Sequence, residues 1–379
     1  MIIHLSRPDI TDLERSAVSE VLATPLLSMG PKVLAFEQAF VQRLGCRHAA
    51  AVNSGTSALV LALLAMSIGP GDEIVTTPFS FIASSNCILT VGATPVFADI
   101  DPHTWNLDPT AAAAAVTPRT RALLPVDVFG NPVDMDRLTD LACRHGLRIV
   151  EDSCEALGAS YKGRPAGRLG EIGVFGFYPN KQITTGEGGM VVTDDAELHT
   201  LVVSMRNQGR GPGGGWLAHE RLGFNHRLSD INCALGLAQM QRLSEILAKR
   251  ERVAALYRER LRDEPRIQLQ QVTDGARESP FVFVVRLGDE YSGDDRDRFL
   301  NDLQQRGIGC SNYFPPIHLQ PFYAARFRFK RGDFPVCEAL AERTIALPFH
   351  ANLTEAEVDE VCRTVVSLLS SPKIRRAVG

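Results

Sequence analysis

Short apolar runs alternate with amphipathic segments from about residue 30 to residue 205. In residues 31–44, Val33, Phe36 and Phe40 recur at the spacing of one helix face, which predicts an amphipathic helix. The same patterns predict further helices separated by short buried strands. The expected helices span 57–67, 81–90, 134–145 and 196–205, and the expected strands span 49–52, 73–77, 95–99, 122–126, 148–151, 174–177 and 190–193.

Regular alternation of strand and helix predicts a mainly parallel sheet that is covered on both faces. We therefore expect a large α/β domain over residues 1–245, with an N-terminal arm at 1–30. In such a domain, ligands bind at the carboxyl ends of the strands. The polar side chains that directly follow each strand are therefore the candidates for function.

The C-terminal part follows a different pattern, which predicts a smaller α+β domain over residues 246–379. A glycine-rich segment at 208–216 precedes it and is either a flexible surface loop or a flap over a site. The expected elements are a long helical stretch at 229–263, a strand at 281–287, helices at 294–306 and 355–369, and a proline- and aromatic-rich loop at 313–323.

Composition narrows the classes of function. The chain has 379 residues, 45% of them hydrophobic, and a net charge of −4, which gives no electrostatic case for nucleic acid or an anionic membrane as partner. Residues 74–98 carry no charge, but their prolines, glycine and polar side chains indicate buried α/β interior, so we expect no membrane segment.

The eight cysteines are scattered without the spacing of a zinc site. We therefore expect no metal, reduced thiols and a cytoplasmic protein. The N-terminal residues also lack the apolar core of a signal peptide.

The segment from Asn53 to Leu59 follows a predicted strand and opens a helix. Gly55 allows close approach of the backbone, and Thr56 and Ser57 place hydroxyls beside free N–H groups, which suits a phosphate. Ordinary capping of a helix would use the same residue types, so the turn alone leaves both interpretations open.

Glu151 and Asp152 end another predicted strand. Successive strand residues face opposite ways, so only one of these carboxylates needs to serve a site. A buried aspartate requires a cationic partner, such as a protonated pyridine nitrogen. A structural role as a helix cap is the alternative for Asp152.

Lys181 stands between two apolar strands in a stretch rich in glycine, threonine and asparagine, unlike a lysine on a charged helix face. Such a lysine can be fixed and partly desolvated, which lowers the pKa of the amine and permits a Schiff base. A lysine on a glycine-rich hairpin is the structural alternative. A phosphate turn, an acid for a ring nitrogen and an amine for an aldehyde are together the attachments of pyridoxal phosphate.

These motifs resemble the DegT/DnrJ/EryC1/StrS family of sugar aminotransferases, which are fold-type I pyridoxal-phosphate enzymes. The resemblance runs nearly end to end and is carried most specifically by residues 54–59 and 180–182. It also includes the motifs at 77–83, 92–97, 151–152 and 223–230.

The resemblance implies roles for matching positions. Lys181 would form the Schiff base and move the proton during transamination, and Asp152 would hold the pyridine nitrogen protonated. Gly55 and Thr56 would bind the phosphate, with Phe81 on the ring face and Glu155 near the ring hydroxyl. Asn225 would reach the partner subunit's phosphate, which makes a homodimer part of the active site.

The chain departs from the family pattern at several positions. The family often has glutamine where this chain has Glu155, and commonly has a phosphate-binding serine where this chain has Gly176. Asp127 stands where histidine is frequent. Dehydratases of a related branch replace the lysine with histidine, so Lys181 argues for an aminotransferase.

The sequence therefore predicts an aminotransferase that moves an amino group from L-glutamate to a keto group of a nucleotide-linked deoxysugar. A cyclitol or aminoshikimate-type ketone is an alternative acceptor, because Tyr313 and His318 of the small domain could line a pocket for either. A regulatory protein that binds the cofactor without turnover is an alternative of a different class.

Overall fold

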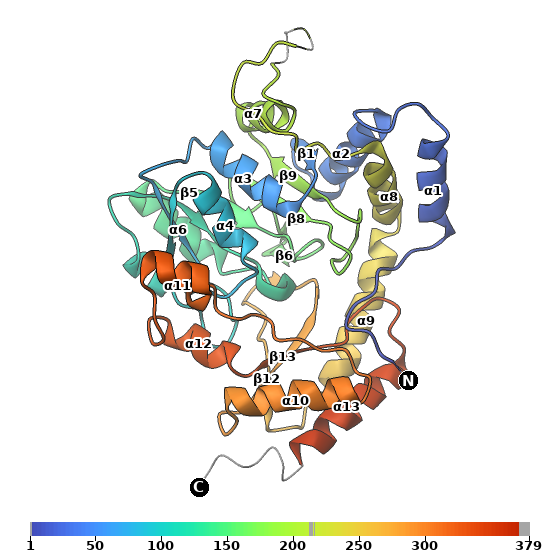
Figure 1. The fold of residues 1–379 in the computed structure, drawn as a ribbon, viewed down its shortest axis with the longest axis vertical. Coiled ribbons are helices and arrows are strands. Elements are labelled where there is room, and N and C mark those ends of the chain that lie inside the picture. Colours follow the sequence, from blue (N-terminus) through green and yellow to red (C-terminus); the bar gives the residue numbers. More distant parts are fainter. Residues whose placement is uncertain (1, 212–214, 216, 371–379) are drawn as a thin grey trace.

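The computed structural model describes residues 2–211, 215 and 217–370, and it is built around a seven-stranded sheet (Figure 1). The strand order is β1-β9-β8-β5-β4-β2-β3. Six of the seven strands run in the same direction, and β9 alone runs in the opposite direction. The predicted mainly parallel α/β sheet is therefore confirmed. The strands are β1 (His48–Val52), β2 (Glu73–Thr76), β3 (Thr94–Phe97), β4 (Thr120–Leu124), β5 (Arg148–Asp152), β8 (Ile172–Gly176) and β9 (Gly189–Thr193).

Helices cover both faces of this sheet because neighbouring strand residues point to opposite sides. Val174 and Val191 pack in the cluster that contains α3, whereas Phe175 and Met190 pack in the cluster that contains α2. The helices of this region are α2 (Pro31–Leu44), α3 (Gly55–Ala65), α4 (Ala83–Thr90), α5 (Pro109–Ala114), α6 (Met135–His145) and α7 (Ala196–Arg206), together with the short helix η1 (Val128–Gly130).

A second sheet lies at the opposite end of the molecule, at the bottom of Figure 1, with strand order β10-β12-β13. Its apolar residues form a separate core with the helices around it. The elements of this core are β10 (Ile267–Leu269), β12 (Phe283–Leu287), β13 (Thr344–Leu347), α9 (Leu243–Leu261), α10 (Gly293–Gln305) and α13 (Glu355–Leu369). From the same part of the sequence, η2 (Ile317–Leu319), α11 (Pro321–Phe327) and α12 (Pro335–Ala341) pack instead in clusters shared with the large sheet.

A small third sheet joins the N- and C-terminal halves of the chain. In it, β6 (Ser160–Tyr161) pairs with both β7 (Arg164–Pro165) and β11 (Ala276–Arg277). The N-terminal segment also contacts the C-terminal half, because Ile3 pairs with Ile308. The domain boundary at residues 245–246 stays a prediction.

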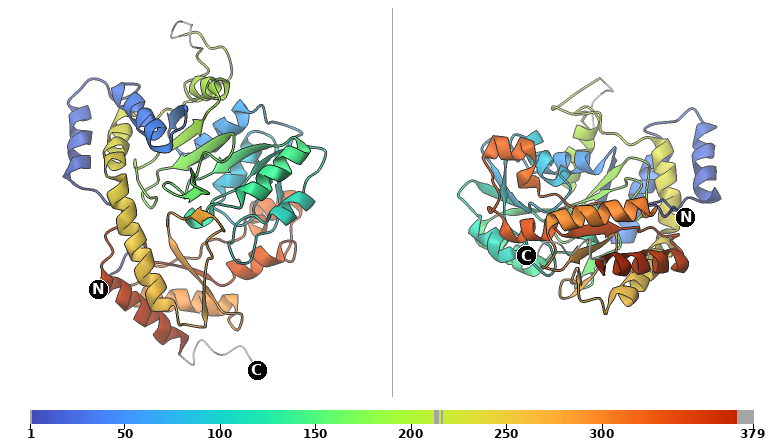
Figure 2. Two further views of the ribbon diagram at one scale, coloured as in Figure 1. Left: turned by 180° about the vertical axis from the view of Figure 1, so that it is seen from behind. Right: turned by 60° about the horizontal axis from the view of Figure 1, so that its bottom comes forward.

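The expected long helix is in fact two helices. α8 (Asp230–Gln241) ends at Arg242, whose backbone leaves the helical conformation, and α9 continues toward the second sheet (Figures 1 and 2). A further helix, α1 (Asp12–Leu22), packs against α8 and was not expected. Its N-terminus is a capping box formed by Thr11 and Glu14.

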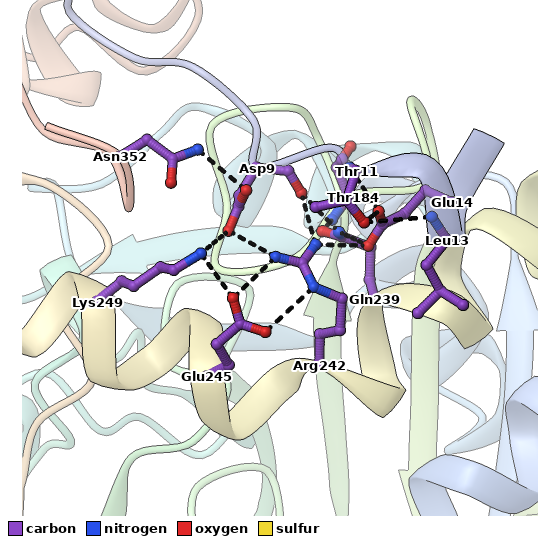
Figure 3. Close-up of polar contacts among 10 residues, drawn as sticks. All are labelled: Asp9, Thr11, Leu13, Glu14, Thr184, Gln239, Arg242, Glu245, Lys249 and Asn352. Atoms are coloured by element: carbon purple, nitrogen blue, oxygen red, sulfur yellow. Dashed lines mark hydrogen bonds and ion pairs between the residues drawn. The ribbon is translucent and has the colours of Figure 1, made fainter.

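Arg242 occupies this break because its guanidinium meets several acidic side chains (Figure 3). It lies 3.0 Å from Asp9 and 2.8 Å from Glu14 of the N-terminal segment. Gln239 donates to Glu14 at 2.8 Å and accepts from the backbone N–H of Thr184 at 3.4 Å. The cluster therefore connects the N-terminal segment, the helix break and the loop that carries Lys181.

None of the helices in the described part of the chain is both long and apolar enough to span a membrane. Of the glycine-rich segment at 208–216, residues 212–214 and 216 lie outside the described residues, so its predicted role as a loop or a flap is not tested.

Candidate active site

A cavity of about 640 Å³ opens at the carboxyl ends of the central strands. The predicted residues Gly55, Asp152, Glu155 and Lys181 all line it, although they are spread over more than 120 positions of the sequence. Its further predicted lining residues are Thr56, Phe81 and Tyr313. These residues, predicted from the ends of different strands, therefore lie together at one cavity.

Lys181 is held by the loop between β8 and β9. Its backbone N–H donates to the carbonyl of Tyr178 at 2.9 Å. Next to it, the buried amide of Gln182 donates to the carbonyls of Glu155 and Ser279. The hydroxyl of Thr184 closes the loop by donating to the carbonyl of Phe177 at 2.9 Å. Side-chain hydrogen bonds thus fix backbone that no helix or strand orders.

The ammonium group of Lys181 faces one anion and one aromatic ring. Its Nζ lies 3.3 Å from Glu155 Oε1 and 3.9 Å from the centre of the Phe281 ring. The side chain is 14% exposed, so the amine is reached through the cavity. This is the arrangement expected of an amine that reacts with a bound carbonyl compound.

Glu155 is a second buried carboxylate of the site. Burial raises the pKa of its carboxyl group, while Lys181 and the backbone N–H of Phe129 oppose that rise. Phe129 donates to Glu155 Oε2 at 2.9 Å, which leaves Oε1 directed at the lysine. Glu155 therefore stands where it can accept a hydrogen bond from a group beside the amine.

Asp152 is 4% exposed and has no cationic partner within ion-pair distance among the described residues. Its oxygens accept hydrogen bonds from the hydroxyl of Ser84 at 2.7 Å and from the backbone N–H of Cys154 at 3.2 Å. A buried carboxylate without a cation is costly, so this residue is suited to a cationic ligand in the cavity.

The N-terminus of α3 forms another part of the cavity wall. Ser54 caps the helix by accepting from the N–H of Ser57 at 3.0 Å. A Cβ atom at Gly55 would lie 2.9 Å from Cys154 Sγ and 3.3 Å from Gly176 Cα, so only glycine fits here without displacement. The turn thus brings the helix N-terminus to the cavity, where an anion can bind.

Three predicted site residues do not line this cavity, namely Ser57, Asn225 and His318. Ser57 is engaged with Ser54 in the helix cap, which is the structural interpretation that the sequence left open. Asn225 is exposed on the segment that pairs with Asn207.

The prediction for His318 is corrected by the structure. Its side chain is fully buried, its Nε2 donates to the carboxylate of Glu338 at 3.0 Å, and its ring packs against that of Phe334. The histidine therefore completes an aromatic cluster of the C-terminal part and offers no atom to a ligand. Tyr313, from the same loop, does line the cavity.

Two contacts of the site escaped sequence reasoning. Ser84, which holds Asp152, lies in the uncharged stretch 74–98 that was interpreted only as interior. Phe281 opens the segment before β12 and was expected only as a strand residue. Neither has a local motif, because each acts through a partner about 70 or 100 positions away in the chain.

The residues present fit pyridoxal phosphate. The unpaired carboxylate of Asp152 suits the pyridinium nitrogen, the helix N-terminus at Gly55 suits the phosphate, and Lys181 suits the aldehyde. Phe81 is 61% exposed at the cavity and provides a face for the ring. No group of three or more potential metal ligands occurs among the described residues.

Residues 8–366 match the DegT/DnrJ/EryC1/StrS aminotransferase family. The chain belongs to this family. It is a pyridoxal-phosphate-dependent sugar aminotransferase, and the sequence resemblance is confirmed.

Individual relatives extend over almost the whole chain. GDP-perosamine synthase of Caulobacter vibrioides is 41% identical over 369 residues, which are 97% of this chain and 98% of that protein. Spore coat polysaccharide biosynthesis protein SpsC of Bacillus subtilis is 38% identical over 370 residues, covering 95% of each.

Solved structures agree with this assignment. Helicobacter pylori PseC, an aminotransferase involved in the biosynthesis of pseudoaminic acid, superposes with a TM-score of 0.91 at 32% identity. The match covers 97% of this chain and 99% of that one. The fold is therefore that of the fold-type I pyridoxal-phosphate enzymes, as predicted.

Proposed function

We propose that this aminotransferase transfers an amino group from L-glutamate to a keto group of a nucleotide-linked deoxysugar. The supporting observation is that the cavity with Lys181 and Asp152 occurs in a chain similar over nearly its full length to GDP-perosamine synthase. Similarity to PseC, an aminotransferase involved in the biosynthesis of pseudoaminic acid, supports the same class of acceptor.

The residues of the cavity would divide the work. When bound, pyridoxal phosphate supplies an electron sink that stabilises negative charge on the substrate carbon. Lys181 Nζ binds the cofactor and, once free, accepts and returns the proton of the reacting carbon. Asp152 holds the proton on the ring nitrogen, and Glu155 orients the group beside the amine. Gly55 and Thr56 bind the phosphate, and Tyr313 limits the substrate pocket.

The active unit would be a homodimer. Several large apolar side chains around α1 and the start of α2 are at least 44% exposed in the single chain, which indicates a surface that a second copy covers. Asn225 is exposed and could reach the neighbouring phosphate from such a position. These apolar residues are Leu22, Leu26, Leu27, Met29 and Leu34.

A cytoplasmic location is part of the proposal. All eight cysteines are free in the described structure, and six of them are buried, which suits a reducing compartment.

The proposal is tested in two half-reactions. Glutamate should convert the cofactor absorbance of the purified protein to that of the amine form within a single turnover. The amine form is then offered to a panel of nucleotide-linked 4-keto and 3-keto sugars and, separately, to keto-cyclitols. Recovery of the original absorbance with a nucleotide sugar supports the proposal, whereas recovery only with a cyclitol contradicts the proposed acceptor.

A further inference from the structure

Two buried serines, Ser80 before α4 and Ser84 in its first turn, form a hydrogen-bonded series that ends at Asp152. Ser84 Oγ lies 2.7 Å from Asp152 Oδ2, and Ser80 Oγ lies 2.9 Å from Ser84 Oγ. Both serines line the cavity, and neither is more than 4% exposed. The two serines therefore lie where Asp152 faces a ligand in the cavity.

The direction of these hydrogen bonds follows from the number of hydrogens. An ionised carboxylate only accepts, so Ser84 donates its single hydroxyl hydrogen to Asp152. The oxygen of Ser84 is then left as an acceptor, and Ser80 must be the donor in the second bond. Successive donors that point the same way polarise one another and strengthen the last bond of the chain.

The two hydrogen-bonded serines affect the basicity of Asp152. The other donors to Asp152 in the described structure come from Cys154: its N–H, at the longer distance of 3.2 Å on the opposite oxygen, and its thiol. Burial makes a carboxylate a stronger base, whereas hydrogen bonds to the charged form make it a weaker one. Removal of Ser84 would therefore leave an under-solvated carboxylate that competes better for a shared proton.

We propose that Ser84, supported by Ser80, is a positioning residue that keeps the shared proton on the cofactor's ring nitrogen rather than on Asp152. It does so by stabilising the ionised carboxylate and by fixing the direction of Oδ2. The inference rests on the proposed role of Asp152, and both serines act through that residue. Only a protonated ring nitrogen is a strong electron sink, so the serines affect the rate without touching the substrate.

The experiment measures where the proton lies. Protein loaded with cofactor that carries ¹⁵N in the ring is studied by NMR, because the ¹⁵N chemical shift reports protonation of that nitrogen directly. Wild type defines one limit. Asp152→Asn defines the other, because a neutral amide leaves the ring nitrogen unprotonated.

In Ser84→Ala, the ¹⁵N signal should lie between these two limits, and kcat should fall about tenfold with little change in the KM for glutamate. Ser84→Thr keeps the hydroxyl and should restore the wild-type signal. Ser80→Ala keeps the direct bond to Asp152 and should move the signal in the same direction by less, so it tests the chain even if Ser84→Ala loads poorly.

Ser85→Ala is the matched control, because it deletes a fully buried hydroxyl of the same helix that is not the partner of Asp152. A wild-type signal in Ser84→Ala, or an equal displacement in Ser85→Ala, would overturn the inference. If Asp152→Asn itself leaves the signal unchanged, the proposed role of Asp152 fails instead, so the two failures are distinguishable.

Discussion

Lys181 Nζ and Glu155 Oε1 lie 3.3 Å apart in a cavity where both side chains are largely buried. The pair places an anion beside the amine that binds the cofactor. Burial raises the pKa of Glu155, and the nearby ammonium of Lys181 opposes that rise.

Replacement of Glu155 by Gln should change the pH dependence of the bound cofactor while the fold is retained. The anion of Glu155 lies beside the lysine nitrogen that binds the cofactor and favours the protonated form of that nitrogen. Loss of the anion should therefore lower the pH midpoint of the cofactor's spectral transition by about one unit. Absorbance titration of the loaded protein measures this midpoint. An unchanged midpoint would show that Glu155 does not face the cofactor.

Substitutions of two glycines near the proposed phosphate site should have different effects on cofactor affinity. Gly55→Ala places a Cβ atom 2.9 Å from Cys154 Sγ and should weaken cofactor binding at least tenfold, because the turn must move. Gly176→Ser meets Cys154 only at 3.4 Å, which is ordinary contact, and adds a hydroxyl near the helix N-terminus. It should bind the cofactor as well as wild type or more tightly. Equilibrium titration of the apo protein compares the two variants, and equal losses in both would contradict this geometry.

The cluster around Arg242 should make stability dependent on pH at the acid end. Although burial opposes ionisation, hydrogen bonds from Thr11 and Arg242 lower the pKa of Glu14 to about 2. The folded value lies below the unfolded value, so this stabilisation is complete above pH 4.5 and is lost as the pH falls toward 2.

Arg242→Ala should therefore lower the free energy of unfolding by about 3 kcal/mol at neutral pH, and by less at pH 3. Urea denaturation at the two pH values measures the difference. Arg363→Ala removes the exposed ion pair with Glu360 and should change stability by less than about 0.5 kcal/mol. Equal effects of the two substitutions would exclude a special role for the cluster.

Asp127 and Glu151 form a buried pair of acids behind the site. Ser153 Oγ lies 2.7 Å from Asp127 Oδ2 and 3.1 Å from Glu151 Oε1, and one hydroxyl hydrogen cannot serve both. Burial and the other carboxylate raise the pKa of Asp127 well above its usual value, whereas three backbone N–H groups counter the effect of burial on Glu151. Asp127 is therefore the protonated member.

Asp127→Asn should be tolerated, because the amide can donate to Ser153 and accept from Val133 as the protonated acid does. The wild-type protein loses stability as the pH rises toward the raised pKa of Asp127, whereas Asp127→Asn has no such proton to lose. The free energy of unfolding of Asp127→Asn relative to wild type should therefore increase with pH, by at most about 1.4 kcal/mol per pH unit. Glu151→Gln should instead destabilise the protein by about 2 kcal/mol or more, because its amide would face backbone N–H donors. Thermal melts from pH 5 to 8 test both expectations, and a tolerated Glu151→Gln would reverse the assignment.

The sequence predicted that Lys181, Asp152 and Gly55 would lie together, because strand ends converge in space. All three directly follow or adjoin a buried strand, and the parallel sheet brings those ends together. Glu155 was reached only through the family resemblance, since nothing local marks it as a partner of the lysine.

Other features depend on contacts that periodicity does not encode. His318 of the small domain was expected to line the substrate pocket, but the loop directs its side chain into an aromatic cluster beside Glu338. The break at Arg242 was missed because apolar periodicity continues through it, whereas its cause is ion pairing with the N-terminal segment. α1 was missed although the Thr11 capping box was visible in the sequence.

The central claim is that Lys181 is the residue that binds pyridoxal phosphate. The cofactor-loaded protein is reduced with borohydride, which makes the bond between lysine and cofactor permanent, and its peptides are mapped by mass spectrometry. Other lysines, such as Lys162 and Lys249, are paired with Asp136 and Asp9 and do not line the cavity. The reduced cofactor is expected on the peptide that contains Lys181. An adduct on a different lysine, or none in a protein that transaminates, would contradict the central claim.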